Sequence, residues 1–206
     1  MNMEAFIRPL TPQDLPQVAQ IHCAAFPQSA LSRLGVEATR RYYEWQLLGP
    51  HQALALGCVA QGRLAGFCFA GVFNGAMSGF LRRNRSFLLR RLLTRPWLFA
   101  SAMVRERAQL ALGILRRRRG AAPGKIAVPG FGVLAIAVLP EHQGRGLGKL
   151  LMNQVESAAR QAGFTQMTLS VHAANQQAIL FYQRLGWRKL IEDGVWRNGI
   201  MIKDLA

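Results

Sequence analysis

The stretch from Gly132 to Gly148, GVLAIAVLPEHQGRGLG, constrains the fold of this 206-residue chain more than any other. It contains a continuous apolar run, Leu134 to Val138, which is typical of a strand covered on both faces. Pro140 ends the run, and apolar residues then recur at helical spacing from residue 150 to 159. Between the two segments, glycine stands at every second position: Gly144, Gly146 and Gly148. The sequence therefore predicts a strand, a glycine-rich loop and a helix, in that order.

A glycine-rich loop at a helix N-terminus favours anion binding. Without a Cβ in the way, backbone N–H groups can approach the anion, and the helix dipole attracts negative charge. The Walker loop requires Gly-Lys-Ser/Thr, but Leu150 stands where the hydroxyl residue is needed. The dinucleotide fingerprint requires Gly-x-Gly-x-x-Gly, and the spacing here is Gly-x-Gly-x-Gly. The loop is therefore a phosphate cradle of another kind, or a tight turn that binds nothing.

Two segments of the chain resemble one protein family. Gln143 to Gly148, QGRGLG, resembles the Gln/Arg-x-x-Gly-x-Gly/Ala signature of the GNAT superfamily of acetyl-CoA-dependent N-acetyltransferases. Downstream, residues 166–171 predict a strand and residues 174–187 a helix that ends at a glycine C-cap. That helix resembles the family's second segment, in which an asparagine begins the helix and a tyrosine precedes a closing glycine-aromatic pair: Asn175, Tyr182 and Gly186–Trp187.

The resemblance implies a single α/β domain over residues 1–206. Its sheet is expected to be mixed and mostly antiparallel, with six or seven strands and helices on both faces. The N-terminal half adds three predicted strands, 5–8, 53–60 and 63–72, the last two joined by a hairpin turn at Gln61–Gly62. Helices are predicted to begin at Pro12 and to run over residues 36–48. Residues 73–126 have no counterpart in the family pattern and are predicted to form an arginine-rich helical insertion.

The resemblance also implies how acetyl-CoA would be bound. In the family, acetyl-CoA lies in a V-shaped opening beside the central strand, and the amine attacks the thioester directly. The main chain of Ile136, Ala137 and Val138 would pair with the pantetheine arm. Asn175 would bind that arm or an ordered water, or cap its helix. The pyrophosphate would be held by the loop, namely Gln143, Gly144, Arg145, Gly146, Leu147 and Gly148.

Tyr182 matches the family's general acid, which donates a proton or a hydrogen bond to the departing thiolate. The alternative is a core tyrosine whose hydroxyl finds a partner. The general base is open, because the central strand carries no acid. Glu141, His142 and His172 flank the strand ends, and Glu37 and Glu44 are candidates from the helical side. Glu37, Tyr42 and Glu44, in the helix predicted over 36–48, are candidates for substrate contact, or are aromatic core and solvated acids.

The acceptor is constrained only by its basicity. At neutral pH an α-amine with a pKa near 7.8 is neutral in about one molecule in seven, whereas far less than about 1% of an alkylamine with a pKa near 10.4 is neutral. A site without a strong base therefore favours an α-amine or an amino sugar. Two alternatives come from other classes: an acyltransferase that uses a longer acyl donor or an acidic acyl carrier, and a non-catalytic acetyl-CoA-binding sensor.

Residues 81–120 hold most of the positive charge. They contain twelve arginines against one acid, Glu106, a net +11 of the chain's +16. Apolar residues recur among them at helical spacing and predict two amphipathic basic helices, which Arg105 to Arg107 keep from spanning a bilayer. Such helices can lie on anionic lipid, bind an acidic partner or cover the core. Nucleic acid is disfavoured, since no recognition motif is present. We predict peripheral contact with anionic membrane and a small-molecule or membrane-associated amine as substrate.

The remaining composition bears on compartment and metal binding. Cys23, Cys58 and Cys68 stand in apolar contexts without Cys-x-x-Cys spacing, which favours reduced thiols. The four histidines show no ligand spacing, so no metal is predicted. The first fifteen residues lack a basic region leading into an apolar stretch. We therefore expect a cytoplasmic protein, with the basic insertion able to hold it at the inner face of the membrane.

Overall fold

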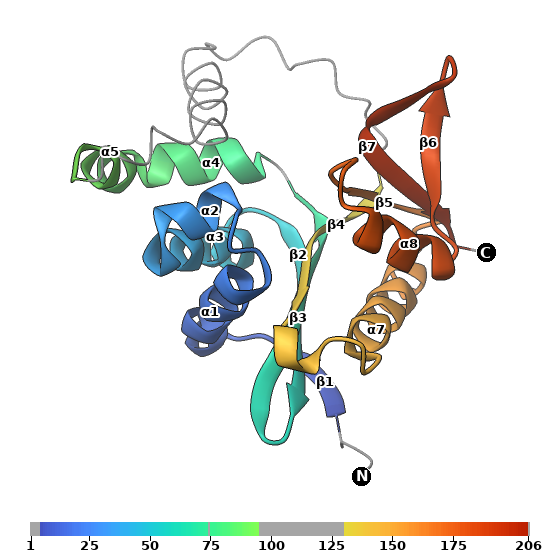
Figure 1. The fold of residues 1–206 in the computed structure, drawn as a ribbon, viewed down its shortest axis with the longest axis horizontal. Helices are drawn as coiled ribbons and strands as arrows, with labels where there is room; N and C mark the ends of the chain where they lie inside the picture. Colours follow the sequence, from blue (N-terminus) through green and yellow to red (C-terminus); the bar gives the residue numbers. More distant parts are fainter. Residues whose placement is uncertain (1–4, 74, 95–129, 206) are drawn as a thin grey trace.

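A computed structural model describes residues 5–73, 75–94 and 130–205, and Figure 1 shows how they are arranged. The described strands form a seven-stranded sheet in the order β1-β2-β3-β4-β5-β7-β6. Strands β4 and β5 are parallel, and all other neighbours are antiparallel. This confirms the predicted mixed, mostly antiparallel sheet. The strands are β1 Ala5–Pro9, β2 Gln52–Ala60, β3 Arg63–Val72, β4 Phe131–Val138, β5 Gln166–Ser170, β6 Arg188–Glu192 and β7 Val195–Asp204.

Helices cover both faces of the sheet, as expected (Figure 1). One face carries α1 (Leu15–Ala25) and α3 (Val36–Leu48), with the short α2 (Ala30–Leu34) beside them. The other face carries α7 (Leu147–Gln161) and α8 (Gln176–Arg184), of which α7 contacts β1 to β4. The helix predicted over residues 36–48 is therefore confirmed.

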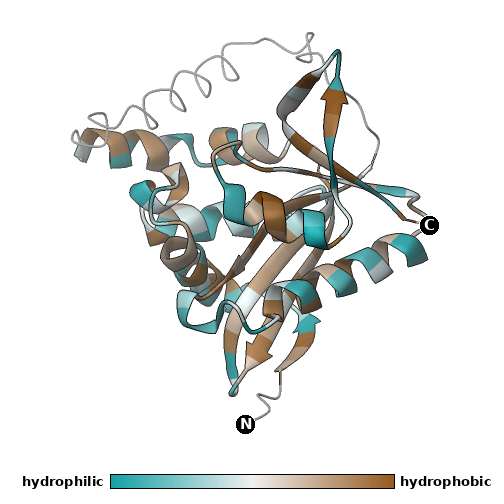
Figure 2. Cartoon of the chain, turned by 45° about the vertical axis from the view of Figure 1, so that its right-hand side comes forward, coloured by the Kyte–Doolittle hydropathy of each residue, from teal (hydrophilic) through white to brown (hydrophobic). Residues whose placement is uncertain are grey.

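Strand β3 shows why the central strands lack a clear apolar alternation in sequence. Phe67 and Phe69 point into the core cluster under α1 and α3, whereas Cys68 and Ala70 point into the cluster under α7. All four side chains are fully buried, so both faces of the strand require apolar residues. Figure 2 shows the central strands mostly in hydrophobic colours, with α7 banded hydrophobic and hydrophilic.

The predicted helix start at Pro12 is a short 3-10 helix, η1 (Pro12–Asp14), and the α-helix begins at Leu15. Pro16 lacks an N–H and cannot donate to Pro12 four residues back, so the first turn closes through the Leu15 N–H to the Pro12 oxygen instead. The Asp14 carboxylate fixes this turn, because it lies 2.6 Å from the Arg8 guanidinium and accepts the Thr11 N–H at 2.8 Å.

The part of the insertion that the structure describes is helical. It forms α4 (Ala76–Arg83) and α5 (Arg85–Thr94) instead of one continuous helix. Asn84 separates the two, and its side-chain amide donates to the Phe80 carbonyl at 3.1 Å. The second predicted basic helix and the return segment up to residue 129 lie outside the described residues. No helix in the described ranges has the length and apolarity needed to cross a membrane.

Candidate active site

The central strand β4 is paired along its whole length on one side and along only part of it on the other. Strand β3 follows it from Gly132 to Val138, but β5 pairs only with Phe131 to Val133. Beyond that point β4 and β5 diverge. The strand predicted over Leu134 to Val138 is confirmed, yet Leu134 to Ile136 are only partly covered. The candidate cofactor residues Ile136, Ala137 and Val138 thus lie where the β5 side of β4 has no strand partner in the described structure.

A β-bulge marks the point of divergence. Phe69 is opposite Ala135 and Ala70 is opposite Val133, so Leu134 is the extra residue in β4. A bulge bends the strand that carries it, and here it bends β4 where its pairing with β5 stops. The sequence gives no signal for this bulge, because Leu134 is neither glycine nor part of a turn pattern.

Loop residues 143–146 lead from the end of β4 into α7. A short helix, η3 (Pro140–His142), precedes them, and the Gln143 side chain donates to the Val138 carbonyl at 3.0 Å. Gly144 and Gly146 have φ angles of +74° and +82°, which glycine adopts more readily than other residues. A Cβ at either position would meet no described atom within 4 Å. The space in front of this backbone is therefore open.

Among the described residues, no side chain caps the start of helix α7. Gly146 is its N-cap residue, and the first helical hydrogen bond runs from the Leu150 N–H to the Gly146 carbonyl at 3.0 Å. The N–H groups of the first turn before Leu150 are thus the orphan donors of a helix N-terminus, and they face the open loop. Gly148 has another role, because a Cβ there would lie 3.3 Å from Phe181 Cζ, and its absence lets α8 pack closely on α7.

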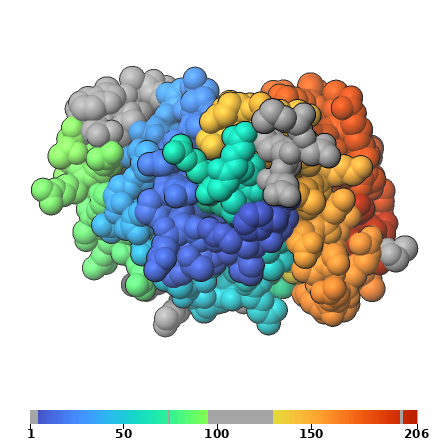
Figure 3. Space-filling view, turned by 90° about the horizontal axis from the view of Figure 1, so that it is seen from below, coloured from blue at the N-terminus to red at the C-terminus, as the bar shows by residue number. Residues whose placement is uncertain are grey.

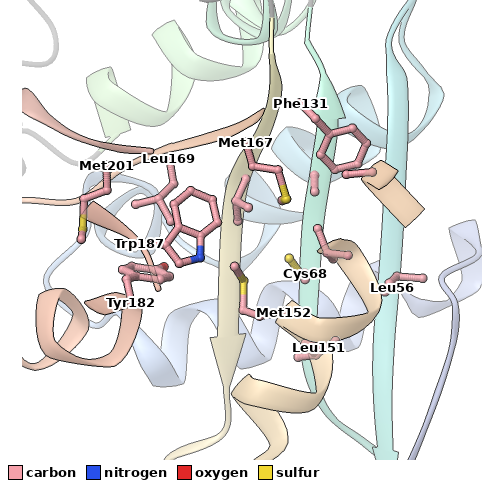
Figure 4. Close-up of a cluster of buried hydrophobic side chains, with 14 of the residues drawn as sticks. Leu56, Cys68, Phe131, Leu151, Met152, Met167, Leu169, Tyr182, Trp187 and Met201 are labelled. Atoms are coloured by element: carbon pink, nitrogen blue, oxygen red, sulfur yellow. The ribbon is translucent and has the colours of Figure 1, made fainter. Parts of the chain in front are cut away.

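Asn175 and Tyr182 lie at the start and in the last turns of α8. The Asn175 side-chain oxygen accepts the Ala178 N–H at 3.1 Å, so the residue is the N-cap, and its role towards a cofactor stays a prediction. Tyr182 is 9% exposed, and the centre of its ring lies 5.2 Å from that of Phe181. Figure 4 shows it beside Trp187, whose ring centre is 6.1 Å away. The environment of Tyr182 among the described residues is aromatic.

The environment of Tyr182 keeps its hydroxyl protonated. Burial, and secondarily the neighbouring Cys68 thiol, raises the pKa of Tyr182 well above its usual value. Burial likewise raises the pKa of Cys68 to about 12. At physiological pH the site therefore contains a neutral phenol that can donate a proton or hydrogen bond, and a neutral thiol that is a poor nucleophile.

The position of Tyr182 depends on how the C-terminal end of α8 is held. The backbone turns at Gly186, with φ +84°, and the Trp187 N–H donates to the Tyr182 carbonyl at 3.0 Å. Lys203 of β7 donates to the Leu185 carbonyl and, at 2.7 Å, to the Glu156 carboxylate of α7. One ammonium group therefore links α7, α8 and β7.

The predicted substrate contacts on α3 have partners within the fold. Glu37 lies 2.8 Å from Arg40 and 2.7 Å from Arg41, and these guanidinium groups lower its pKa to about 2. Glu44 also pairs with Arg40, at 3.2 Å. Tyr42 is buried, and burial raises its pKa to about 12. A role of Glu37, Tyr42 or Glu44 in acceptor binding stays a prediction.

The candidate bases near the strand ends do not all face the same region. Glu141 and His142 belong to η3 and line a cavity of about 720 Å³ that they form with α1 and the β2–β3 turn. His172 follows β5, and its Nδ1 accepts the Ala174 N–H at 3.2 Å. The described residues contain no cluster of three or more groups that could hold a metal ion.

Comparison with known proteins gives a family and a fold. The model of the acetyltransferase (GNAT) family matches residues 15–187. A curated relative, the thialysine N-epsilon-acetyltransferase of Sus scrofa, is 35% identical over 75 residues, which cover 34% of this chain and 44% of that protein. The match thus spans less than half the length of this relative.

Several solved structures share the fold at low sequence identity. The ribosomal-protein-S18-alanine N-acetyltransferase of Escherichia coli is 18% identical, with 98% of this chain and 95% of that chain covered and a TM-score of 0.57. The PaiA N-acetyltransferase of Thermoplasma acidophilum, in complex with coenzyme A, is 16% identical, with 98% and 99% covered and a TM-score of 0.58. A GNAT family acetyltransferase of Brucella melitensis, in complex with acetyl-CoA, is 17% identical, with 98% and 89% covered and a TM-score of 0.54.

Proposed function

The chain belongs to the acetyltransferase (GNAT) family, and we propose that it transfers the acetyl group of acetyl-CoA directly to a primary amine. One observation carries the proposal: β4 loses its β5 partner after Val133, and its C-terminal end leads through the glycine loop into the uncapped start of α7. An open strand edge and an anion site follow one another in the chain. Two structures with the same fold were determined with coenzyme A or acetyl-CoA.

The residues present fit the two ends of acetyl-CoA. Its pyrophosphate requires hydrogen-bond donors and positive potential, which the first-turn N–H groups of α7 and the dipole of that helix supply. The open space at Gly144 and Gly146 lets phosphate oxygens approach the backbone. The pantetheine arm contains amide groups, and an open β-strand edge such as residues 134–138 offers matching N–H and C=O groups, apart from the Val138 carbonyl, which accepts the Gln143 side chain. Arg145 adds positive charge to the loop.

We assign Tyr182 as the general acid. Once acetyl-CoA is bound it supplies the thioester carbon that the amine attacks. Its thiol has a reference pKa near 8.5, so the thiolate is a good leaving group and a hydrogen bond from a neutral phenol is sufficient help. The raised pKa of Tyr182 keeps that phenol protonated. An N–H on the open edge of β4 is suited to stabilise the oxyanion that forms during attack. The high pKa of Cys68 supports direct transfer rather than a thioester on the protein.

We propose an α-amine or an amino sugar as the acceptor. Strand β4 carries no carboxylate, and Glu37, with a pKa of about 2, is a weak base. An amine that is already partly neutral at physiological pH needs the least help. A cytoplasmic location agrees with the free and buried thiols of Cys58 and Cys68, which suit a reducing compartment.

Thiol release from acetyl-CoA tests this function. The purified chain is incubated with acetyl-CoA and one acceptor at a time: an amino sugar, a peptide with a free α-amine, a polyamine, or lysine whose α-amine is blocked. We expect release above the buffer rate with an α-amine or amino sugar and little with the alkylamines. Acetyl-CoA binding in calorimetry without thiol release for any acceptor class would indicate a sensor instead of an enzyme. Preferred thiol release with the alkylamines would contradict the proposed acceptor class but would still support acetyltransferase activity.

A further inference from the structure

Helix α5 presents an outward face that the fold does not use. Its inner side holds it in place: Leu88 packs against the core cluster, the Arg91 Nε donates to the Leu34 carbonyl at 3.0 Å, and the Arg41 guanidinium lies 4.4 Å from the centre of the Phe87 ring. The opposite side of the helix forms one stripe, which we call the α5 outer face. It consists of Arg85, Ser86, Leu89, Arg90 and Leu93, all of them exposed.

The α5 outer face is apolar at its centre. Leu89 and Leu93 are one helical turn apart and are 61% and 81% exposed. Leu93 is the most exposed large apolar side chain among the described residues. Because the inner side already fixes the helix, these two leucines contribute little to the core in the described structure. A helix that only shields the core from water would carry polar residues there.

The rim of the α5 outer face is positively charged. Arg85 and Arg90 flank the leucines, and Arg82 and Arg83 follow at the adjoining end of α4. All four are exposed, and none forms an ion pair within the described residues. The sequence of α4 and α5 contains no acidic residue. The charge of this face is therefore not neutralised by the described part of the fold.

We propose that the α5 outer face rests on an anionic lipid surface, an interaction beyond the acetyl transfer proposed above. Leucines at the centre with arginines at the rim match the layers of such a surface, in which acyl chains lie below negatively charged headgroups. A purely acidic protein surface would match the arginines but would leave the two leucines at the centre of the face without an apolar partner. The placement agrees, because α4 and α5 lie at the end of the molecule away from α7 and α8 (Figures 1 and 3). A bound membrane would thus leave the glycine loop accessible.

Vesicle sedimentation of the full chain tests this proposal. We expect binding to vesicles of phosphatidylglycerol mixed with phosphatidylcholine and none to pure phosphatidylcholine. Leu89→Ser with Leu93→Ser should weaken binding roughly 100-fold, because two leucines no longer leave water. Arg85→Ser with Arg90→Ser should weaken it about 30-fold at low salt, and less at high salt, where screening already removes the attraction.

Matched variants separate this face from general apolarity and charge. Ile191→Ser with Val195→Ser removes side chains that are 60% and 64% exposed in β6 and β7, and should leave vesicle binding unchanged. Arg63→Ser with Arg184→Ser makes the same change in net charge at exposed sites on β3 and α8 and should cost much less affinity than the Arg85 and Arg90 pair.

A local probe reports the contact directly. With Cys23, which is only partly buried, changed to Ser, an environment-sensitive fluorophore on Leu93→Cys should shift to the blue when phosphatidylglycerol vesicles are added, and the same fluorophore on Ile191→Cys should not. Three results would overturn the proposal. The first is no binding of the wild-type chain to anionic vesicles at low salt. The second is an equal loss of vesicle affinity in the test and control variants. The third is a leucine double variant that changes the melting temperature but not vesicle binding, which would show that another part of this chain covers the face.

Discussion

Gly146→Asp separates the cofactor site from the stability of the fold. Gly146 has a φ of +82° and caps α7, and a Cβ there meets no described atom within 4 Å. The fold should therefore lose only the cost of a non-glycine residue in the left-handed region, about 1–2 kcal/mol. A carboxylate at a helix N-terminus gains about 0.3–1 kcal/mol, which offsets part of that loss. A net loss of about 1 kcal/mol should lower the melting temperature by about 2–4 °C.

The same substitution should be severe for acetyl-CoA. A carboxylate about 4 Å from a phosphate oxygen costs about 4 kcal/mol at the effective dielectric constant of a protein surface, which corresponds to roughly 1000-fold weaker binding. Calorimetric titration with acetyl-CoA measures the affinity, and thermal unfolding of the same sample measures stability. We expect the acetyl-CoA affinity to fall strongly while the melting temperature changes little.

Gly163 provides a matched control at the other end of α7. Its φ is +80°, and a Cβ there also meets no described atom within 4 Å. Gly163→Asp introduces the same strain, and its charge lies at a helix C-terminus, where it is disfavoured. It should destabilise the fold at least as much as Gly146→Asp and leave acetyl-CoA affinity unchanged. Wild-type affinity in Gly146→Asp, or an equal loss in both variants, would refute the phosphate cradle.

Three further predictions concern Tyr182, His22 and the Lys203–Glu156 pair. Tyr182→Phe should lower kcat by ~10²-fold or more with unchanged acetyl-CoA affinity, because only the hydrogen bond to the thiolate is lost; wild-type turnover at every pH would make Tyr182 structural. Burial lowers the pKa of His22 to about 4, against about 6.5 when unfolded, so below about pH 6.5 the unfolded chain binds a proton that the folded chain does not. Stability in urea should therefore fall by about 2 kcal/mol between neutral pH and about pH 5, and an unchanged pH slope in His22→Gln would be inconsistent with this. The Lys203 ammonium lies 2.7 Å from the buried Glu156 carboxylate, so Lys203→Met leaves that carboxylate without its partner and should lower the free energy of unfolding in urea by about 3–5 kcal/mol. If the double variant with Glu156→Leu lost as much stability, the unpaired carboxylate would not be the cause.

Local sequence patterns predicted most of the elements that build the fold. Gln61 and Gly62 have φ angles of 52° and 72°, as the hairpin predicted between the second and third strands requires. Gly186, with φ +84°, closes α8 where the glycine C-cap was expected. These features depend on the backbone preferences of a few adjacent residues. The same is true of Gly144 and Gly146, whose positive φ angles suit the predicted loop.

Features that depend on distant contacts were not predictable in the same way. The bulge at Leu134 arises from the register of β3 against β4, and no residue in β4 signals it. Gly148 was expected to serve the loop, but its missing Cβ also makes room for Phe181 of α8. The ion pairs of Glu37 with Arg40 and Arg41 follow from helical spacing, yet the sequence left Glu37 open as a substrate contact. A helical turn begins at Pro12 as expected, but it is the 3-10 turn η1, and the α-helix begins at Leu15 because Pro16 interrupts the hydrogen-bond ladder.

Transfer of a labelled acetyl group in a single turnover tests the central claim most directly. The chain, in excess over acetyl-CoA that carries the label in its acetyl group, is mixed with an amino sugar or an α-amine, and the label is followed in the N-acetylated product and on the protein. We predict that the label appears in the amide product at the rate of thiol release and never accumulates on the protein, and that Tyr182→Phe slows both steps together. Label on a cysteine, or no labelled amide with any amine, would contradict direct acetyl transfer by this chain.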